Sequence, residues 1–158
     1  MMEASSPTKQ ASPRQIAAAA ADLLDQGAVI DRLSRPLTIA ALLGLIVGLG
    51  IELGALLTAG LLFVSLAGLI ETYLALRVGF DAALFRRLEQ GESGAMPDLG
   101  TLDAALVALG LLPRSKVGRS VEQRALGARR LLTLQGAALA FQVAIILLAT
   151  ALVQAHVS

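Results

Sequence analysis

The sequence contains no cysteine and a single histidine, His156. Without cysteine, disulfides, thiolate nucleophiles, iron–sulfur clusters and cysteine-ligated zinc are all excluded. A histidine-based metal centre would need further ligands, and no such set accompanies His156. Motifs for dinucleotide binding, phosphate-binding loops, zinc peptidases and serine hydrolases are also absent, and no nucleophile lies beside a base. We therefore expect a protein that is not an enzyme and that holds no metal or cofactor.

Charge is scarce as well. Charged residues make up 16% of the 158 residues, against about 25% in ordinary soluble domains, and 56% of the chain is hydrophobic. The net charge of +1 provides no global attraction for nucleic acid. Between Leu37 and Ile70 the only charged residue is Glu52. Because roughly 20 apolar residues already cross a bilayer, this stretch predicts an integral membrane protein.

Residues 36–77 are too long for one crossing. A straight helix of this length would extend about 60 Å, twice the hydrocarbon thickness of a bilayer. We therefore predict a transmembrane helical hairpin with one helix over 37–49 and the next over 55–77. The turn is expected at 50–54, where two glycines flank Glu52 and tolerate the backbone angles of a tight turn. The alternative is one long, kinked helix with that carboxylate buried.

A third transmembrane helix is predicted over 131–154, followed by a short tail, 155–158. Every lysine and arginine lies either before the hairpin, in residues 9–35, or after it, in residues 77–130. Because cytoplasmic flanks collect Lys and Arg, the N-terminus and the helical segment 78–130 should be cytoplasmic and the C-terminus on the far side. A composition rich in Ala, Leu, Gly and Arg is typical of GC-rich bacterial genomes, so we expect a multi-pass protein of the bacterial inner membrane.

The N-terminal segment, 1–35, is expected to begin with a disordered tail over 1–11. Ser12 and Gln15 then form a capping-box pattern that opens a helix. One interpretation is an amphipathic arm that lies on the membrane or on a partner. The other is an Ala-rich tail, interrupted by Gly27, that leads into the first span.

The cytoplasmic segment should form a small helical cap. The second hairpin helix is predicted to continue to Gln90, and a short amphipathic helix should follow, with apolar residues over 102–112 and its end at Pro113. Ser120 opens the long helix that becomes the third span. Such a cap is too small for an independent catalytic domain. The fold predicted overall is an all-α integral membrane protein with three transmembrane helices, this cap and the N-terminal arm.

Small residues four apart occur in every predicted span. This spacing lets two helix backbones approach closely, which drives helix association in lipid. Whether the neighbouring helix belongs to the same chain, a second copy or another protein stays open at this point. The predicted helix-packing residues are Gly44, Gly48, Gly60, Gly68, Gly136 and Ala140.

Four polar residues are predicted inside or beside the spans. Glu71 is a candidate ion or proton site, because intramembrane carboxylates are costly. We favour the alternative that it is an interfacial carboxylate that reaches headgroup water or pairs with an arginine. Glu52 has the same two interpretations, and in the turn it is simply solvated. Gln135 and Gln142 share one face of the third span and could hydrogen-bond to a neighbouring helix or to Glu71, or form a polar face packed within the bundle.

Basic residues cluster between the cap and the third span. They could contact anionic headgroups or a partner, and they could equally serve the positive-inside rule alone. These residues are Arg114, Lys116, Arg119, Arg124, Arg129 and Arg130.

The sequence has no catalytic motif and several apolar helix faces. This combination predicts a non-catalytic accessory or assembly subunit of a larger bacterial membrane complex. Its partners would be membrane lipids and other membrane subunits or a second copy, with cytoplasmic subunits bound through the faces at 80–88 and 102–112. The alternative is a small homo-oligomeric transporter or pore that uses Glu71 or Glu52. A holin-like pore-former is a third, weaker option.

Overall fold

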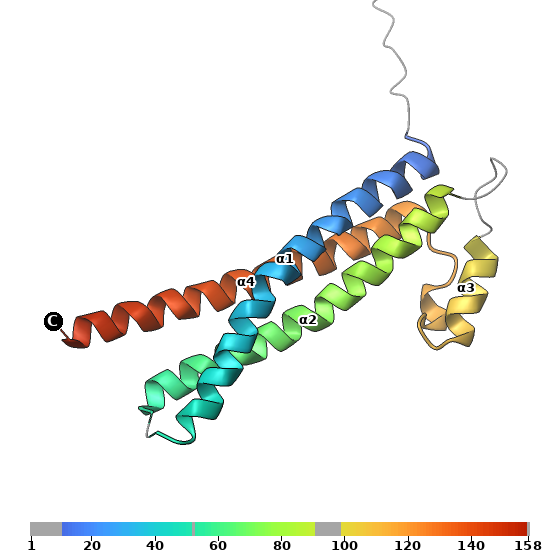
Figure 1. Ribbon diagram of the computed structural model, residues 1–158. Coiled ribbons are helices and arrows are strands. Elements are labelled where there is room, and N and C mark those ends of the chain that lie inside the picture. Colours follow the sequence, from blue (N-terminus) through green and yellow to red (C-terminus); the bar gives the residue numbers. More distant parts are fainter. Residues whose placement is uncertain (1–10, 52, 91–98, 158) are drawn as a thin grey trace, which may run out of the picture.

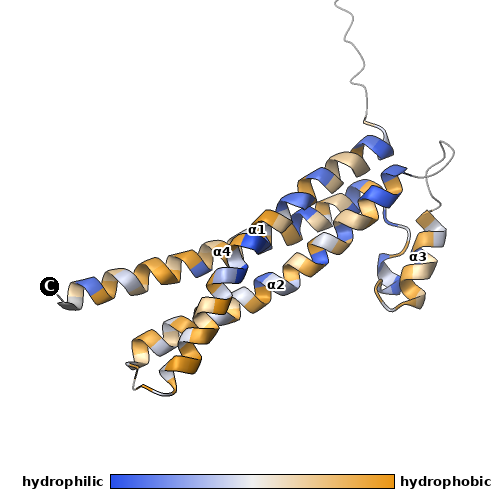
Figure 2. Cartoon of the chain, viewed as in Figure 1, coloured by the Kyte–Doolittle hydropathy of each residue, from blue (hydrophilic) through white to orange (hydrophobic). Residues whose placement is uncertain are grey.

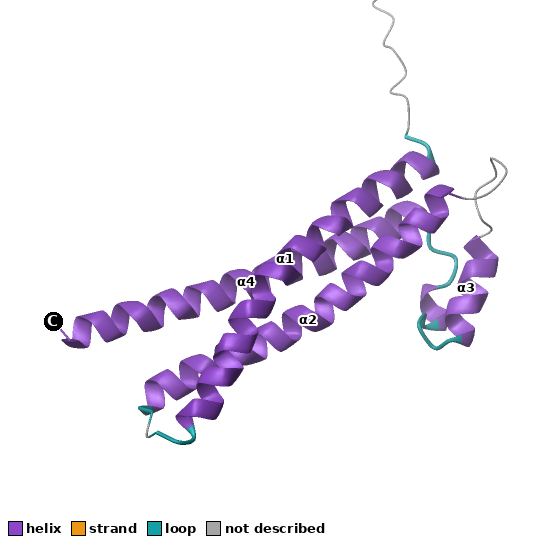
Figure 3. Ribbon diagram, in the orientation of Figure 1, coloured by secondary structure: helices purple, strands orange, loops and turns teal. Residues whose placement is uncertain are grey.

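The computed structural model describes residues 11–51, 53–90 and 99–157 of the chain. Helices dominate these residues, and Figure 3 shows no strand among them. Three long helices and one short one form the fold, which confirms the all-α prediction. In chain order the elements are α1 (Pro13–Gly48), α2 (Ala55–Gln90), α3 (Leu99–Ala108), the additional 3-10 turn η2 (Arg114–Lys116) and α4 (Val121–Val157).

Helices α1 and α2 form an antiparallel hairpin (Figure 1). Helix α1 ends at Gly48 and α2 begins at Ala55, so the predicted turn is confirmed and the single kinked helix is wrong. Helix α2 also continues to Gln90, as its sequence pattern predicts. The candidate carboxylate Glu52 lies outside the described residues.

Helix α1 is longer than expected. The predicted capping box is present, because the Ser12 hydroxyl accepts from the Gln15 N–H at 3.3 Å and the Gln15 side chain accepts from the Ser12 N–H at 2.9 Å. The helix then continues through Pro36 to Gly48, so the expectation of a separate helix that begins at 37 is wrong. Proline lacks the N–H of one helical hydrogen bond, which explains why α1 bends near its middle in Figure 1.

The first half of α1 packs inside the bundle. Its buried face consists of small residues and one leucine, and it meets apolar residues of α2 and α4. Neither an arm on the membrane surface nor a loose tail describes this segment, because it completes the hydrophobic core. The core residues are Ala17, Ala20, Ala21, Leu24, Val78, Ala82, Phe85, Leu88, Val121 and Ala128.

Two described helices, α2 and α4, are long and apolar enough to cross a membrane. The apolar part of α1 covers only residues 37–48, about 18 Å at 1.5 Å per residue, so its crossing stays a prediction. Helices α1 and α2 stay together along their length, whereas the second half of α4 diverges from them (Figure 1). Only 6% of the most apolar window of α4 is buried, so most of this half is exposed within the described chain.

Helix α3 lies beside the polar end of the bundle (Figure 1). Leu106 is buried on its predicted apolar side, but the helix ends at Ala108 and Leu109 is 71% exposed. The helix ends because Gly110 adopts a positive φ of 69°, and the Leu111 N–H donates to the Leu106 carbonyl at 2.9 Å. The sequence prediction that Pro113 stops this helix is therefore wrong by one turn.

Candidate functional site

The interior of the three-helix bundle contains an unusual amount of polar surface. Six buried polar residues lie on the long helices α1, α2 and α4, and Asp103 is buried on α3. Buried polar groups are costly unless they are hydrogen-bonded, so their partners decide what they do. The six residues are Ser34, Thr38, Ser65, Glu71, Gln135 and Gln142.

The outer cluster, formed by Ser34, Thr38 and Gln142, joins all three long helices. The Ser34 hydroxyl donates to Gln142 Oε1 at 2.6 Å. Gln142 Nε2 donates to Thr38 Oγ1 and to the Val64 carbonyl, each at 3.1 Å. The oxygen of this one carboxamide on α4 thus bonds α1, and its nitrogen bonds both α1 and α2.

The inner pair, Glu71 and Gln135, repeats this arrangement two turns away. Gln135 Nε2 donates to Glu71 Oε1 and to the Gly27 carbonyl, each at 2.8 Å. The predicted hydrogen bonds of Gln135 and Gln142 are therefore confirmed, including the bond to Glu71. Because both amides lie on one face of α4, they set the register of α4 against the hairpin.

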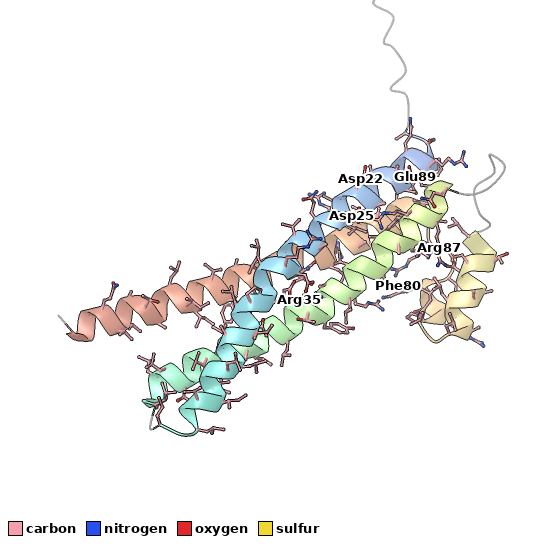
Figure 4. All side chains as sticks on the ribbon, in the orientation of Figure 1. Asp22, Asp25, Arg35, Phe80, Arg87 and Glu89 are labelled. Carbon is pink, nitrogen blue, oxygen red and sulfur yellow. The ribbon has the colours of Figure 1, made fainter. Side chains whose placement is uncertain are left out.

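Glu71 is completely buried, which overturns the interpretation as an interfacial carboxylate. Its hydrogen-bond donor is Gln135 rather than an arginine. Arg35, which is labelled in Figure 4, is near enough to interact electrostatically with Glu71. It is exposed, however, and pairs with Asp31 at 2.7 Å. Among the described residues, Glu71 Oε2, Gln135 Oε1 and the Ser65 hydroxyl are buried oxygens without a hydrogen-bond partner.

Two glycines make these contacts possible. A Cβ on Gly68 would overlap Thr38 Oγ1 and lie 2.6 Å from Gln142 Nε2, so only glycine admits the outer cluster. A Cβ on Gly27 would lie 2.7 Å from Val78 Cγ1 and 2.8 Å from Gln135 Oε1. From the sequence Gly27 was interpreted as an interruption of the helix. It is instead a point where α1 approaches both α2 and α4 closely.

The other predicted packing residues have less crowded surroundings. Gly44 faces Leu61, the nearest atom being 3.2 Å from an ideal Cβ, and a Cβ on Gly48 would overlap the Leu53 side chain. Both glycines therefore face their own hairpin. Gly60 and Gly136 each have one neighbour near 4 Å, namely Ile145 and Ile30. Ala140 is exposed, so no packing role within the chain is seen for it.

Several predicted basic residues meet at a groove between α2, the segment before α4, and the start of α4. This hollow, the basic groove, has a volume of about 250 Å³. Arg77 and Asp81 contribute from α2, Lys116 from η2, and Arg119 from the connection to α4. The apolar part of its wall includes Phe80, Leu84, Phe85, Leu106 and Leu131. Figure 4 shows Phe80 on the side of α2 toward α3.

Burial raises the pKa of Asp81, and the nearby Arg77 opposes this shift. Arg114, Arg129 and Arg130 are exposed elsewhere on the surface. Arg124 is different, because it forms an ion pair with Asp103 at 2.6 Å and both side chains are largely buried. Its role is therefore to hold α3 against α4, rather than to contact headgroups freely.

The Asp103 carboxylate attaches α3 to α4 and to the segment that precedes it. Arg124 Nη2 donates to both its oxygens, and the Gly118 N–H donates to Oδ2 at 2.8 Å. Gly118 has a φ of 77°, a conformation that favours glycine. Burial alone would raise the pKa of Asp103, but the hydrogen bonds from Gly118 and Arg124 outweigh burial and lower it.

This lowered pKa predicts acid-sensitive docking of α3. The carboxylate favours the folded state above its ordinary pKa of about 4, and the benefit is lost as the pH falls through the lower folded pKa. At pH 7, Asp103→Asn should lower the free energy of unfolding by about 1–2 kcal/mol. The loss is no larger because Arg124 also lines an open groove, where solvent screens the ion pair. Thermal unfolding of both proteins in detergent from pH 7 to 3 should show the difference shrinking with acid. A difference that stays constant with pH would contradict this role.

No group of three or more His, Cys, Asp or Glu side chains suited to a metal ion occurs within the part of the chain that the structure describes. Comparison of the chain with protein-family models, curated proteins and solved structures gives no match.

Proposed function

We propose that this chain is a multi-pass membrane protein that acts as a non-catalytic assembly subunit of a larger bacterial membrane complex. In this proposal the buried polar residues hold its own three helices in register. The diverging half of α4 and the adjacent face of α2 receive a transmembrane helix of another subunit.

The distribution of hydropathy supports the membrane location. In Figure 2 the apolar residues of the three long helices gather toward the hairpin turn and the far end of α4, and the hydrophilic residues gather at the opposite end. Arg35 and Arg77 mark the boundary on α1 and α2, and Arg130 marks it on α4. Because cytoplasmic flanks are rich in Lys and Arg, the polar end would face the cytoplasm and the C-terminus the opposite side.

A groove between the apolar ends of α2 and α4 is the observation that carries the assembly role. This α2–α4 groove has a volume of about 490 Å³ and is almost entirely apolar. Its walls include Leu57, Gly60 and Leu61 from α2, and Ile145 and Ala149 from α4. In lipid, helices associate mainly through close packing, and small residues such as Gly60 and Ala149 let a partner backbone approach.

Gly60 offers a direct test, because a larger side chain there fits the chain itself. A Cβ on Gly60 would meet only Ile145 Cγ2, at 4.0 Å, which is an ordinary contact distance. Gly60→Leu should therefore leave the fold intact and fill the α2–α4 groove. When the tagged chain is purified from its native membrane in mild detergent, we expect foreign subunits in stoichiometric amounts with the wild type and a large loss with Gly60→Leu.

Gly79→Leu is the matched control, since Gly79 lies on the same helix and a Cβ there meets nothing within 4 Å. It should retain the partner. A wild-type chain that purifies only with itself or alone would contradict the assembly role. Equal partner recovery from both variants would exclude the α2–α4 groove as the binding surface.

A second candidate is a small homo-oligomeric transporter or pore that uses Glu71. The observation in its favour is the buried Oε2 of Glu71, which has no hydrogen-bond partner among the described residues. This role predicts proton- or ion-coupled flux in liposomes that Glu71→Gln abolishes. Unchanged flux, or none from the wild type, would remove it.

A further inference from the structure

Three cationic side chains from two distant parts of the sequence line the basic groove. Arg77 comes from α2, Lys116 from η2 and Arg119 from the connection to α4. None of these three side chains forms an ion pair with a carboxylate of the described residues. The groove also contains Arg124, whose charge is balanced by Asp103, and one acid of its own, Asp81. The excess of positive charge is therefore suited to an anionic group.

The remaining wall of the basic groove is apolar, which distinguishes it from a site for a free ion. Phe80 and Leu84 of α2, Leu106 of α3 and Leu131 of α4 line it. Phe85 adds a side chain that is only 2% exposed. A ligand that satisfies both parts of the wall must carry an anionic group next to a hydrocarbon portion, as a phospholipid does.

The position of the basic groove fits the same ligand. Arg77 directly follows the apolar stretch of α2, and Leu131 begins the apolar stretch of α4. If α2 and α4 cross the membrane as proposed above, the groove opens at the level of the lipid headgroups. Its volume of about 250 Å³ is suited to a headgroup and not to a whole lipid, whose chains would stay in the bilayer.

We infer that the basic groove binds the phosphate headgroup of an anionic phospholipid, with Arg77, Lys116 and Arg119 as the phosphate-binding residues. The lipid would join the cap to the start of α4, because its contacts come from α2, η2 and α4 together. The inference rests on the proposed membrane location but not on the assembly partner. The basic groove and the α2–α4 groove share no residue.

The test measures the unfolding temperature of the full chain, purified in a neutral detergent, as phosphatidylglycerol is added. Phosphatidylcholine and inorganic phosphate serve as separate additions. We expect phosphatidylglycerol to raise the unfolding temperature in a saturable manner and the other two to have little effect. The triple variant Arg77→Gln, Lys116→Gln, Arg119→Gln should bind phosphatidylglycerol roughly 100-fold more weakly, the scale expected for three basic groups near an anionic surface.

Two further variants keep the test decisive. Arg32→Gln, Arg86→Gln, Arg87→Gln removes the same charge from exposed positions outside the groove and should bind like the wild type. The charge-conserving variant Arg77→Lys, Lys116→Arg, Arg119→Lys should keep most of the lipid preference. Equal losses in the two glutamine variants, an equal response to inorganic phosphate, or no wild-type response to phosphatidylglycerol would each overturn the inference. Loss of lipid binding with retained subunit recovery would leave the proposed assembly role standing.

Discussion

Gly68→Leu is expected to separate the helices of the bundle. The new Cβ would overlap Thr38 Oγ1 and crowd Gln142 Nε2, so α1 and α4 could not keep their present distance from α2. Overpacking costs about 1–3 kcal/mol, and each broken hydrogen bond of the outer cluster adds about 1 kcal/mol. We therefore expect a loss of roughly 3 kcal/mol or more in the free energy of unfolding, measured by denaturant titration in detergent.

Two glycines on the same helix provide controls for this result. Gly79→Leu introduces a side chain into open space, and Gly60→Leu meets one atom at ordinary contact distance. Both should remain close to the wild type in stability. If Gly68→Leu were as stable as these two variants, the close approach of α1 and α4 to α2 at this point would be wrong.

Gln135→Leu should strongly destabilise the chain, because it leaves Glu71 buried with no hydrogen-bond donor. The cost expected is about 1–3 kcal/mol, toward the lower end if the pair lies within lipid. Glu71→Leu should also destabilise, because Gln135 then loses one of its two acceptors. Combining the two substitutions should recover part of the loss, since replacing both partners by apolar groups removes the unsatisfied atoms.

Glu71→Gln should behave differently and keep the stability of the wild type or exceed it. The carboxamide still offers an oxygen to Gln135 Nε2, and its nitrogen can donate to Gln135 Oε1, which lacks a partner among the described residues. Unfolding titrations of the two single leucine variants, the double variant and Glu71→Gln would measure the coupling. Additive losses in the double variant would show that Glu71 and Gln135 do not interact. A stable Glu71→Gln protein also makes the flux test of the transporter candidate interpretable.

Local sequence rules predicted the ends of several elements correctly. The Ser12 capping box, the glycine-flanked turn and the continuation of α2 to Gln90 depend only on residues close in the chain. One expectation that failed was also local, because the first hairpin helix was expected to begin at 37, whereas α1 continues through Pro36 to Gly48. Proline removes one hydrogen bond, but Ser34 and Thr38 on either side of it bond Gln142 of α4 and hold that turn in place.

The buried face of the first half of α1 was missed for a different reason. It is made of Ala17, Ala20, Ala21 and Gly27, whose small side chains give a weak hydropathy pattern. Such residues are buried because they let backbones approach, a property that appears only when the neighbouring helix is in place. Glu71 was misplaced for the same reason, since its donor lies 64 residues away in the sequence.

The sequence by itself determined the all-α fold, the hairpin turn and the polar and apolar ends of the helices, because these properties depend on residue type and short-range spacing. Only the tertiary structure decided which atoms meet. The bonds from Ser34 and Gly27 to α4 each span 108 residues, and three separate elements form the basic groove. The divergence of the second half of α4 from the hairpin is equally a property of the tertiary structure, because it concerns the placement of one helix against two others.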